Sequence, residues 1–198
     1  IEVVEASLPQ LDGLTPEERY VICRIVRAEG DPEIAKAVGF SPGAVDLGIA
    51  AIKAKAAVVT DVRMVEVGIS KALLGKCGIT THCQIDTPNT AERAKADGTT
   101  RSVAAVRELT PNLNGAIAVV GNAPTALLAL LDMITTGEVS PALVIGMPVG
   151  FIACAESKAE LAKVDVPYIA IWERRGGSSA AAATVNALLG LALQEVTF

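Results

Sequence analysis

Five side chains able to bind a polar or anionic ligand follow two short apolar runs of the sequence. Residues 116–120 (AIAVV) and 142–146 (ALVIG) predict buried parallel strands, and the helical pattern between them joins the two strands into a βαβ unit. Ligands bind open parallel sheets at the carboxyl ends of the strands. We therefore expect a candidate site on one rim of the sheet, formed by Asn122, Thr125, Glu156, Ser157 and Lys158.

Arg101 and Ser102 lie in the first turn of a further predicted helix, which a threonine at position 99 or 100 caps. A first turn favours acidic residues, so an arginine there is mildly unfavourable unless an anion lies nearby. A ligand carboxylate would remove this conflict, and an ion pair with a surface Asp or Glu is the structural alternative. Lys158, which follows Ala-Glu-Ser, has the same two interpretations.

His82 is the only histidine, and therefore the only ordinary side chain that titrates near neutral pH. It lies in a predicted strand beside Cys83, where it is either a site residue or a core imidazole with satisfied hydrogen bonds. Arg27 ends the first predicted helix, where a cation interacts favourably with the helix dipole whether or not it binds a ligand. Both residues thus keep a structural interpretation beside the functional one.

Gly177 and Ser178 belong to a Gly-rich segment, RRGGSS, between a predicted strand and an Ala-rich helix. Exposed N–H groups and the dipole at such a helix start favour an anion. The segment matches neither the GxGxxG nor the GxxxxGKS pattern, so it does not predict nucleotide binding. Taken alone, the motif favours a turn that needs glycine for its backbone angles.

The composition argues against several classes of protein. With a net charge of −5 and no basic stripe, the chain does not predict a nucleic-acid surface. Its four cysteines are scattered without a CxxC pair, which argues against a metal site or a disulfide framework. The start is acidic, unlike a signal peptide, and polar residues interrupt the apolar tracts before they could span a membrane. We expect a soluble cytoplasmic protein.

The order of the predicted elements indicates an α/β fold. A helix is expected from Thr15, where Pro16 and Glu18 complete a capping box, to about Gly30. Further helices are expected over 31–39 and over 40–56, the latter with Ser41 as its cap. Strands are expected at 57–60, 78–85, 116–120, 142–146 and 167–173. The alternation predicts a single domain, residues 1–198, with three layers: a mainly parallel sheet of about five strands and helices on both faces.

Several long motifs resemble those of one enzyme family, and they occur in family order over nearly the whole chain. They are FSPGAV (40–45), DVRMVEVGI (61–69), TRSVAA (100–105), GNAPTAL (121–127), GMPVGFIACAESK (146–158) and VPYIAIWERRGGSSAAAATVNAL (166–188). On these motifs the sequence is identified as a member of the precorrin-8X methylmutase family of cobalamin biosynthesis, also called precorrin isomerase.

The resemblance implies a homodimeric isomerase that needs no cofactor. Such an enzyme binds a carboxylate-rich corrinoid precursor in a cleft near the dimer interface. It moves a methyl group between neighbouring carbons of ring C, converting precorrin-8 to hydrogenobyrinate, or the cobalt form to cobyrinate. Arg101 and Lys158 match positions expected to contact substrate carboxylates, which the planar fork of an arginine binds in a bidentate manner. The other substrate-binding residues expected at matching positions are Ser102, Asn122, Thr125, Gly177 and Ser178.

Arg27 occupies the position at which the family usually carries a histidine that donates a proton during the methyl shift. An arginine does not give up its proton near neutral pH, so it cannot replace that acid. His82, which aligns with an apolar position of better-known members, is one candidate for a replacement donor. Alternatively, Arg27 stabilises charge while water or the substrate handles the proton. The family also usually has a substrate-contacting serine before the equivalent of Val3, and this chain is expected to act without it.

Two other functions stay open beside the methylmutase. Loss of the family's acid could leave a non-catalytic tetrapyrrole-binding protein that holds the corrinoid for a partner enzyme. An enzyme that acts on another tetrapyrrole or acidic ligand is the third hypothesis. The motifs are compatible with a metal-free substrate and with one that carries cobalt.

Overall fold

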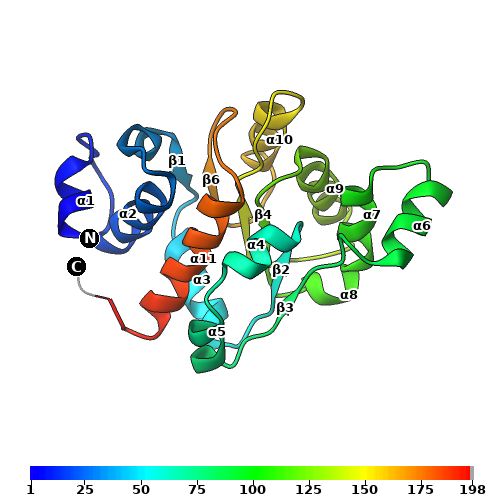
Figure 1. Ribbon diagram of the computed structural model, residues 1–198, viewed down its shortest axis with the longest axis horizontal. Helices are drawn as coiled ribbons and strands as arrows, with labels where there is room; N and C mark the ends of the chain where they lie inside the picture. The colour runs from blue at the N-terminus through cyan, green and yellow to red at the C-terminus, as the bar shows by residue number, and fades with distance from the viewer. Residues whose placement is uncertain (197–198) are drawn as a thin grey trace.

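A computed structural model describes residues 1–196 of the chain, and a six-stranded sheet runs through it (Figure 1). The strand order is β1-β6-β5-β4-β2-β3, with β1 antiparallel to β6 and the other neighbouring pairs parallel. The predicted α/β fold with a mainly parallel sheet is confirmed. The strands are β1 (Val38–Phe40), β2 (Val58–Thr60), β3 (Thr81–His82), β4 (Ile117–Val120), β5 (Leu143–Gly146) and β6 (Tyr168–Ile171).

Alternate residues of the central strands face two hydrophobic cores, one on each side of the sheet. In β4, Ile117 and Val119 belong to the first core, whereas Ala118 and Val120 belong to the second. The first core is covered by α2 (Pro16–Glu29), α3 (Ala44–Lys53), α4 (Arg63–Gly68), α5 (Lys71–Cys77) and α11 (Ser178–Ala192). The second is covered by α7 (Arg101–Glu108), α8 (Thr110–Leu113), α9 (Pro124–Thr135) and α10 (Cys154–Leu161).

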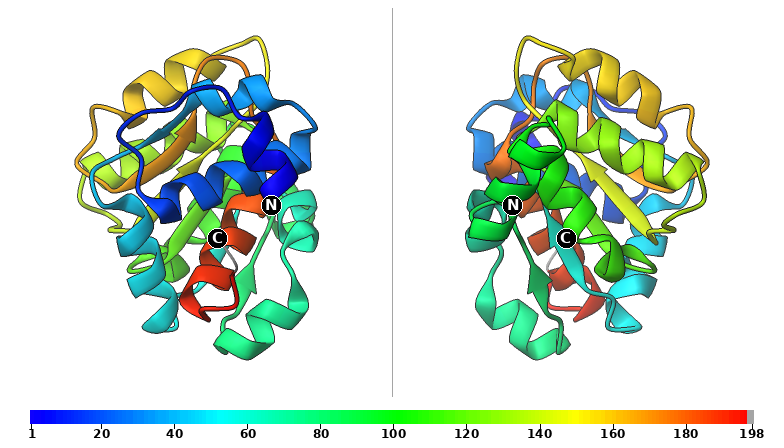
Figure 2. Two further views of the ribbon diagram at one scale, coloured as in Figure 1. Left: turned by 90° about the vertical axis from the view of Figure 1, so that its left-hand side faces the viewer. Right: turned by 90° about the vertical axis from the view of Figure 1, so that its right-hand side faces the viewer.

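These helices give the predicted layers on both faces of the sheet, as the two side views show (Figure 2). Three further elements complete the chain: α1 (Glu2–Ser7), the 3₁₀ helix η1 (Pro32–Ala37) and the surface helix α6 (Pro88–Ala96). No helix within residues 1–196 is both long enough and apolar enough to cross a membrane.

α11 lies at the centre of the first layer, where it contacts α2, α3, α4 and α5 (Figure 1). Small side chains make this approach possible. A Cβ added at Gly68 of α4 would lie 2.8 Å from the Cβ of Ala182, and one at Gly48 of α3 would lie 3.1 Å from Cδ1 of Leu188. The body of α11 is therefore closely packed against α4 and α3.

Local capping explains several helix ends that the sequence predicts. Thr15 and Glu18 form the capping box at the start of α2, and Gly30 ends this helix in the left-handed conformation. The hydroxyl of Thr100 accepts a hydrogen bond from the N–H of Val103, so Thr100 is the N-cap of α7. The predicted starts of both helices are confirmed.

The segment 31–56 differs in part from the prediction. The helix expected over 31–39 is the 3₁₀ helix η1, and the helix expected over 40–56 is the shorter α3, but between them lies β1, an unpredicted sixth strand that pairs with β6. Gly39 permits this pairing because a Cβ there would lie 2.3 Å from Nε1 of Trp172. Ser41 does not cap α3, which begins after Gly43; its hydroxyl instead accepts a hydrogen bond from the N–H of Tyr168.

The predictions also missed five helices and overestimated one strand. α1, α4, α5, α8 and α10 were not expected, and the strand predicted over 78–85 has only two residues in the structure, Thr81 and His82. Only two residues separate the unpredicted α4 from the end of β2. The reason is tertiary: Val65 of α4 is buried in the first core, which stabilises a helix too short to form alone.

Candidate functional site

The carboxyl end of β2 carries a buried acid that holds the loop after β4. Asp61 follows β2 and is only 2% exposed. Its Oδ1 accepts a hydrogen bond from the N–H of Gly121 at 2.9 Å, and its Oδ2 accepts from Asn122 at 3.0 Å and from Ala123 at 2.9 Å. Burial raises the pKa of Asp61, while these three bonds act in the opposite direction. The loop 121–123 is thereby fixed, and the side chain of Asn122 is left exposed.

The same loop lies against the start of α11. A Cβ added at Gly121 would lie 3.1 Å from the Cα of Ser178 and 2.5 Å from Cγ2 of Val65. Two sequence-predicted residues, Asn122 and Ser178, therefore come from neighbouring backbone segments. Gly177, which precedes α11, donates its N–H to the carbonyl of Met147 at 2.8 Å, so the loop after β5 joins this arrangement.

The starts of α7 and α9 also lie side by side. The hydroxyl oxygens of Thr100 and Thr125 are 3.5 Å apart, and Arg101 follows Thr100 directly. The side chains of Arg101 and Thr125 are exposed, and that of Ser102 is half-buried. Arg101 forms no ion pair with any carboxylate within residues 1–196, so the structural alternative of a surface ion pair is wrong for this residue.

Lys158 has a different environment from the one expected for a substrate ligand. Its side chain is 1% exposed, and Nζ donates to the carbonyl oxygens of Glu173 at 3.0 Å and of Arg175 at 2.5 Å. Burial lowers the pKa of this amine. The structure thus places the ammonium on the backbone of the loop after β6, and contact between Lys158 and a substrate carboxylate stays a prediction.

The two residues expected beside Lys158 on the rim also differ from each other. Ser157 is buried, and its hydroxyl donates to the carbonyl of Cys154 at 2.8 Å within α10. Glu156 is exposed. Burial removes Ser157 from the set of side chains that a ligand could reach, so the expectation that all five residues line one rim is wrong for Ser157.

Arg27 lines a cavity of about 370 Å³ between α2, α4 and α11. Arg24, one turn earlier on α2, lines it as well, and neither guanidinium forms an ion pair within the described part of the chain. Two unpaired guanidinium groups give the cavity an affinity for anions. Its remaining lining residues are Ala28, Gly68, Ser179, Ala182, Ala183 and Asn186.

Hydrogen bonds fix the far wall of this cavity. The amide of Asn186 bridges α4 and α5, because its Nδ2 donates to the carbonyl of Gly68 at 3.0 Å and its Oδ1 accepts from the N–H of Ser70 at 2.8 Å. Ser179 donates from Oγ to Oε1 of Glu29 at 2.6 Å, which ties the start of α11 to the end of α2. The cavity therefore has a preformed wall on the α11 side.

His82 lies apart from this cavity. It is half-buried on the edge strand β3, with Nε2 3.4 Å from Oγ1 of Thr80. Figure 1 shows β3 and α2 on opposite sides of α11. The loop after β3 is tied to α4 by Arg63, whose NH2 donates to Oδ1 of Asp86 at 2.6 Å and to the carbonyl of Cys83 at 3.3 Å. The structure does not bring His82 and Arg27 together.

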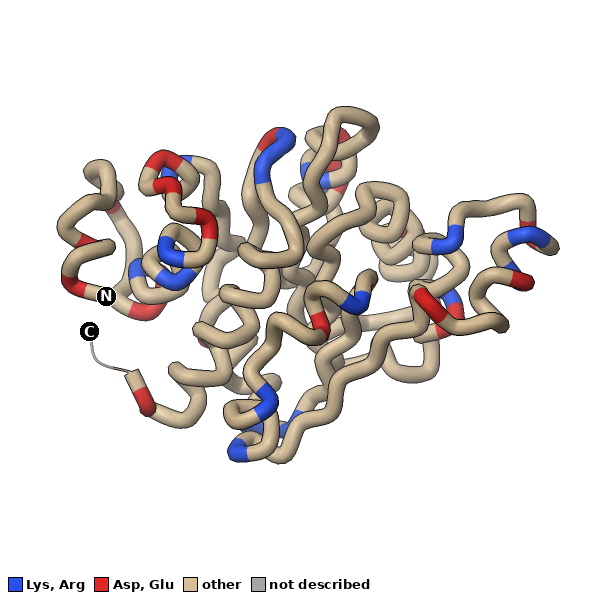
Figure 3. The backbone as a smooth tube through the Cα atoms, in the orientation of Figure 1, with Lys and Arg blue, Asp and Glu red and all other residues tan. Residues whose placement is uncertain are grey.

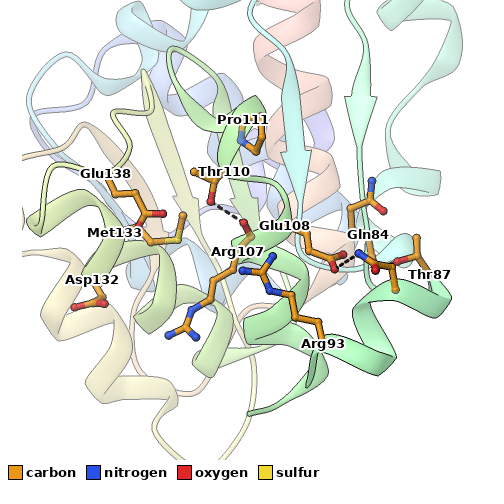
Figure 4. Close-up of a pocket in the computed structure, with 11 residues that line it drawn as sticks. Gln84, Thr87, Arg93, Arg107, Glu108, Thr110, Pro111, Asp132, Met133 and Glu138 are labelled. Atoms are coloured by element: carbon orange, nitrogen blue, oxygen red, sulfur yellow. Dashed lines mark hydrogen bonds between the residues drawn. The ribbon is translucent and has the colours of Figure 1, made fainter. Parts of the chain in front are cut away.

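A second and larger cavity, of about 770 Å³, lies at the other ends of α7 and α9 (Figure 4). Arg107 and Glu108 line it from the last turn of α7, whereas Arg101 lies in the first turn of the same helix. Oε1 of Glu108 accepts a hydrogen bond from Nδ2 of Asn89 at 2.6 Å. No residue of the sequence-predicted site lines this cavity. It is also lined by Gln84, Thr87, Arg93, Thr110, Pro111, Asp132, Met133 and Glu138.

Sequence reasoning missed Asp61, Arg24, Ser179 and Asn186 as parts of the site. Two patterns could have indicated the first two: Asp61 directly follows a predicted strand, as Asn122 does, and Arg24 lies one helical turn before Arg27. The region offers polar hydrogen-bonding groups and unpaired arginines around the start of α11. No group of three or more His, Cys, Asp or Glu side chains that could hold a metal ion is present within residues 1–196.

Comparisons with known proteins give one family for this chain. A sequence model of the precorrin-8X methylmutase family matches residues 1–191. The chain is 41% identical over 184 residues to the cobalt-precorrin-8 methylmutase of Priestia megaterium, a match that covers 93% of this chain and 82% of that protein. It is 41% identical over 182 residues to the precorrin-8X methylmutase of Pseudomonas aeruginosa, covering 90% of this chain and 86% of that one.

The fold is also similar to a solved structure. The crystal structure of the precorrin-8X methylmutase from Thermus thermophilus superposes with a TM-score of 0.89 at 37% sequence identity, covering 99% of this chain and 96% of that one. A precorrin-8X methylmutase related protein superposes with a TM-score of 0.86 at 27% identity, covering 96% and 98%.

Proposed function

Because this chain belongs to the precorrin-8X methylmutase family, we propose that it is an isomerase that moves a methyl group within precorrin-8 or its cobalt form. One observation carries the proposal beyond family membership. The guanidinium groups of Arg24, Arg27 and Arg101 have no carboxylate partner among the described residues. Arg24 and Arg27 line the cavity beside α11, and Arg101 lies at the start of α7, next to the start of α9. A substrate with many carboxylates complements such a surface.

A connected set of backbone contacts supports one extended binding surface. Arg27 and Ser179 line the same cavity, and Ser178 is the next residue of α11. Ser178 lies against Gly121, whose loop carries Asn122 toward the starts of α9 and α7. We infer that the macrocycle lies across these segments, with carboxylates on Arg27 and Arg101. Hydrogen bonds would come from Ser102, Asn122, Thr125, Gly177 and Ser178.

A methyl shift within one molecule leaves the composition unchanged, so it requires no co-substrate. The chain's own task is to hold the substrate and to stabilise charge that develops in the transition state. Arg27 keeps its proton, so its role is electrostatic, and the proton of the reaction comes from water or from the substrate. The position of Arg27 in the cavity between α2 and α11 favours this electrostatic role over a mechanism in which His82 donates the proton.

The proposal includes a homodimer in the cytoplasm, in which residues 1–198 act as one domain. Large exposed apolar side chains support a second copy as partner: Met64 is 71% exposed on α4, and Phe151 is 83% exposed on the loop after β5. We do not expect nucleic acid as a partner, because basic and acidic residues are interspersed along the chain (Figure 3) and the net charge is −5.

The test is to mix the purified protein with precorrin-8, or with its cobalt form, and to follow the visible spectrum. The methyl shift changes the conjugated system, so turnover differs from simple binding. We expect many turnovers per protein with at least one of the two substrates. A single stoichiometric spectral change that then stops would contradict the proposal and would indicate a corrinoid-binding protein. Parallel samples without protein give the spontaneous rate.

A further inference from the structure

Asp61 is an acid whose three hydrogen bonds all go to one loop. Its two carboxyl oxygens accept from the N–H groups of Gly121, Asn122 and Ala123 at 2.9 to 3.0 Å, across 60 to 62 residues of sequence. Its own N–H continues the pairing of β2 with β4 by donating to the carbonyl of Val119 at 3.0 Å. The backbone of Asp61 therefore extends the sheet, while its side chain serves the loop alone.

We propose that Asp61 is a positioning residue, which holds the loop 121–123 so that Asn122 and the start of α9 meet the reacting corrinoid in one fixed geometry. The proposal rests on the methylmutase function. Asp61 does not itself touch substrate, because it is 2% exposed and lies beneath the loop. Its effect on the reaction is exerted through Asn122, whose side chain is exposed.

Only an acidic side chain satisfies this arrangement. Three N–H groups converge on one point, and a carboxyl group offers two oxygens with several lone pairs to accept them. An asparagine in its place would turn an N–H₂ group toward at least one N–H donor. Ala123, the N-cap of α9, forms no side-chain cap of its own, and Pro124 has no N–H to contribute. The acid of a neighbouring strand thus satisfies the donors before α9.

The three hydrogen bonds accepted by the side chain of Asp61 add to a pairing of β2 with β4 that is already complete. β2 and β4 are already paired from Val58 to Thr60 with Ile117 to Val119, so the three side-chain bonds are not required to join the two strands. They fix a segment that lies between Val65 of α4 and Ser178 of α11, where a Cβ at Gly121 would find no room. A displacement of this loop would move Asn122 relative to the Gly-rich segment, and a misplacement of about 1 Å can cost about 100-fold in rate.

The test compares Asp61→Asn with a matched control, Asp86→Asn. Asp86 is an exposed carboxylate after β3 that pairs with Arg63 and makes no contact with the loop. We expect Asp61→Asn to lower kcat about 100-fold while the affinity for the product hydrogenobyrinate changes less than about threefold. Asp86→Asn should leave both values near those of the wild type. A kcat of Asp61→Asn within twofold of the wild type would overturn the proposal.

A double-variant cycle on kcat with Asn122 distinguishes a positioning role of Asp61 from a general loss of stability. If Asp61 acts through Asn122, Asn122→Ala lowers kcat to a similar extent, and the double variant is no worse than either single one. Additive losses in kcat would contradict this. Amide hydrogen exchange at residues 121–123 gives a second readout, which should accelerate in Asp61→Asn but not in Asp86→Asn. If Asp61→Asn does not fold, Asp61→Glu takes its place: it keeps both acceptor oxygens but is one methylene longer, so it should displace the loop and lower kcat in the same direction.

Failure of the methylmutase function can be told apart from failure of this inference. If the wild type binds hydrogenobyrinate but does not turn over precorrin-8, the proposed function is wrong. The inference is then decided by the visible spectrum of bound hydrogenobyrinate, which a displaced loop should shift in Asp61→Asn relative to the wild type. An unchanged bound spectrum together with unchanged amide exchange would refute a positioning role for Asp61.

Discussion

The loops 121–123 and 173–175 both follow parallel strands, but buried side chains of opposite charge hold them. Asp61 accepts hydrogen bonds from three N–H groups of the first loop, whereas Lys158 donates to two carbonyl oxygens of the second. The sign of each buried charge matches the backbone groups that the loop turns inward. A buried charge costs free energy unless it is hydrogen-bonded, so each pairing is required for both the side chain and the loop.

The exposed arginines of the same region are in the opposite situation. Arg27 and Arg101 are exposed and form no ion pair within residues 1–196. The chain thus uses its buried charges to shape loops and leaves its exposed guanidinium groups available for an anion. The predictions below test whether the buried charged residues stabilise loops while the exposed arginines bind the ligand.

The largest effect is expected from Lys158→Met, which keeps the length of the side chain and removes the ammonium. Two partly buried carbonyl groups, of Glu173 and Arg175, then lose their donor. We expect the free energy of unfolding to fall by about 2–4 kcal/mol, since each unsatisfied buried group costs about 1–3 kcal/mol. Urea denaturation gives the value. Lys163→Met is the control, because Lys163 forms an exposed ion pair with Glu160 and should change stability by less than about 0.5 kcal/mol.

If Lys158→Met lowers the free energy of unfolding no more than Lys163→Met does, the buried ammonium contributes nothing to the stability of the loop 173–175. The parallel drawn between the loops held by Asp61 and by Lys158 would then be wrong. Loss of corrinoid binding at full stability would instead return Lys158 to the role that the sequence predicted for it, a direct ligand of a substrate carboxylate.

The next effect concerns the two arginines of the 370 Å³ cavity, the half-buried Arg24 and the exposed Arg27. Arg24→Ala and Arg27→Ala should each weaken the binding of hydrogenobyrinate about tenfold, because each removes a charge-assisted hydrogen bond of about 1.5 kcal/mol. Stability should hardly change. Arg107→Ala is the matched control: its guanidinium is also exposed and without an ion pair among the described residues, but it lines the 770 Å³ cavity. Equal weakening in all three variants, measured by spectral titration, would mean that net charge rather than position attracts the corrinoid.

The sequence predicts those parts of the molecule whose causes are local. The strands β2, β4, β5 and β6 are short apolar runs because both faces of each strand are buried, and the start of α2 follows from the capping box of Thr15 and Glu18. The strand β1 was not predicted, because it depends on hydrogen bonds with β6, which lies far away in the sequence.

The roles of Asp61 and Lys158 depend on distant partners in the same way. An acid after a strand is usually an exposed loop residue, and only the fold brings the N–H groups of 121–123 to Asp61. Similarly, the two carbonyls that bind Lys158 come from the loop after the next strand. In contrast, the positions of Arg101 in the first turn of α7 and of Asn122 just after β4 were predicted correctly, because helix starts and strand ends can be read from the local sequence.

A pH titration of stability sharpens the contrast between buried and exposed acids. Burial raises the pKa of Asp61 above its ordinary value of 3.8, whereas hydrogen bonds from Arg63 lower that of Asp86. The free energy of unfolding of the wild type minus that of Asp61→Asn should therefore fall as the pH rises from about 4 through the raised pKa. Relative to Asp86→Asn, it should lose stability as the pH falls below about 4. Urea midpoints between pH 3 and 7 test both signs, and slopes of the same sign would contradict the assignment.

The smallest effect is expected from His82→Ala. His82 lies on the edge strand β3, across α11 from the arginine cavity, and its Nε2 is 3.4 Å from Oγ1 of Thr80. If the proton of the methyl shift comes from water or the substrate, kcat should fall less than about threefold and its pH profile should keep its shape. A fall of about 100-fold or more, within the range for general acids, with loss of one limb of the profile, would make His82 the proton donor. It would also show that the site extends from α2 across α11 to the opposite edge of the sheet.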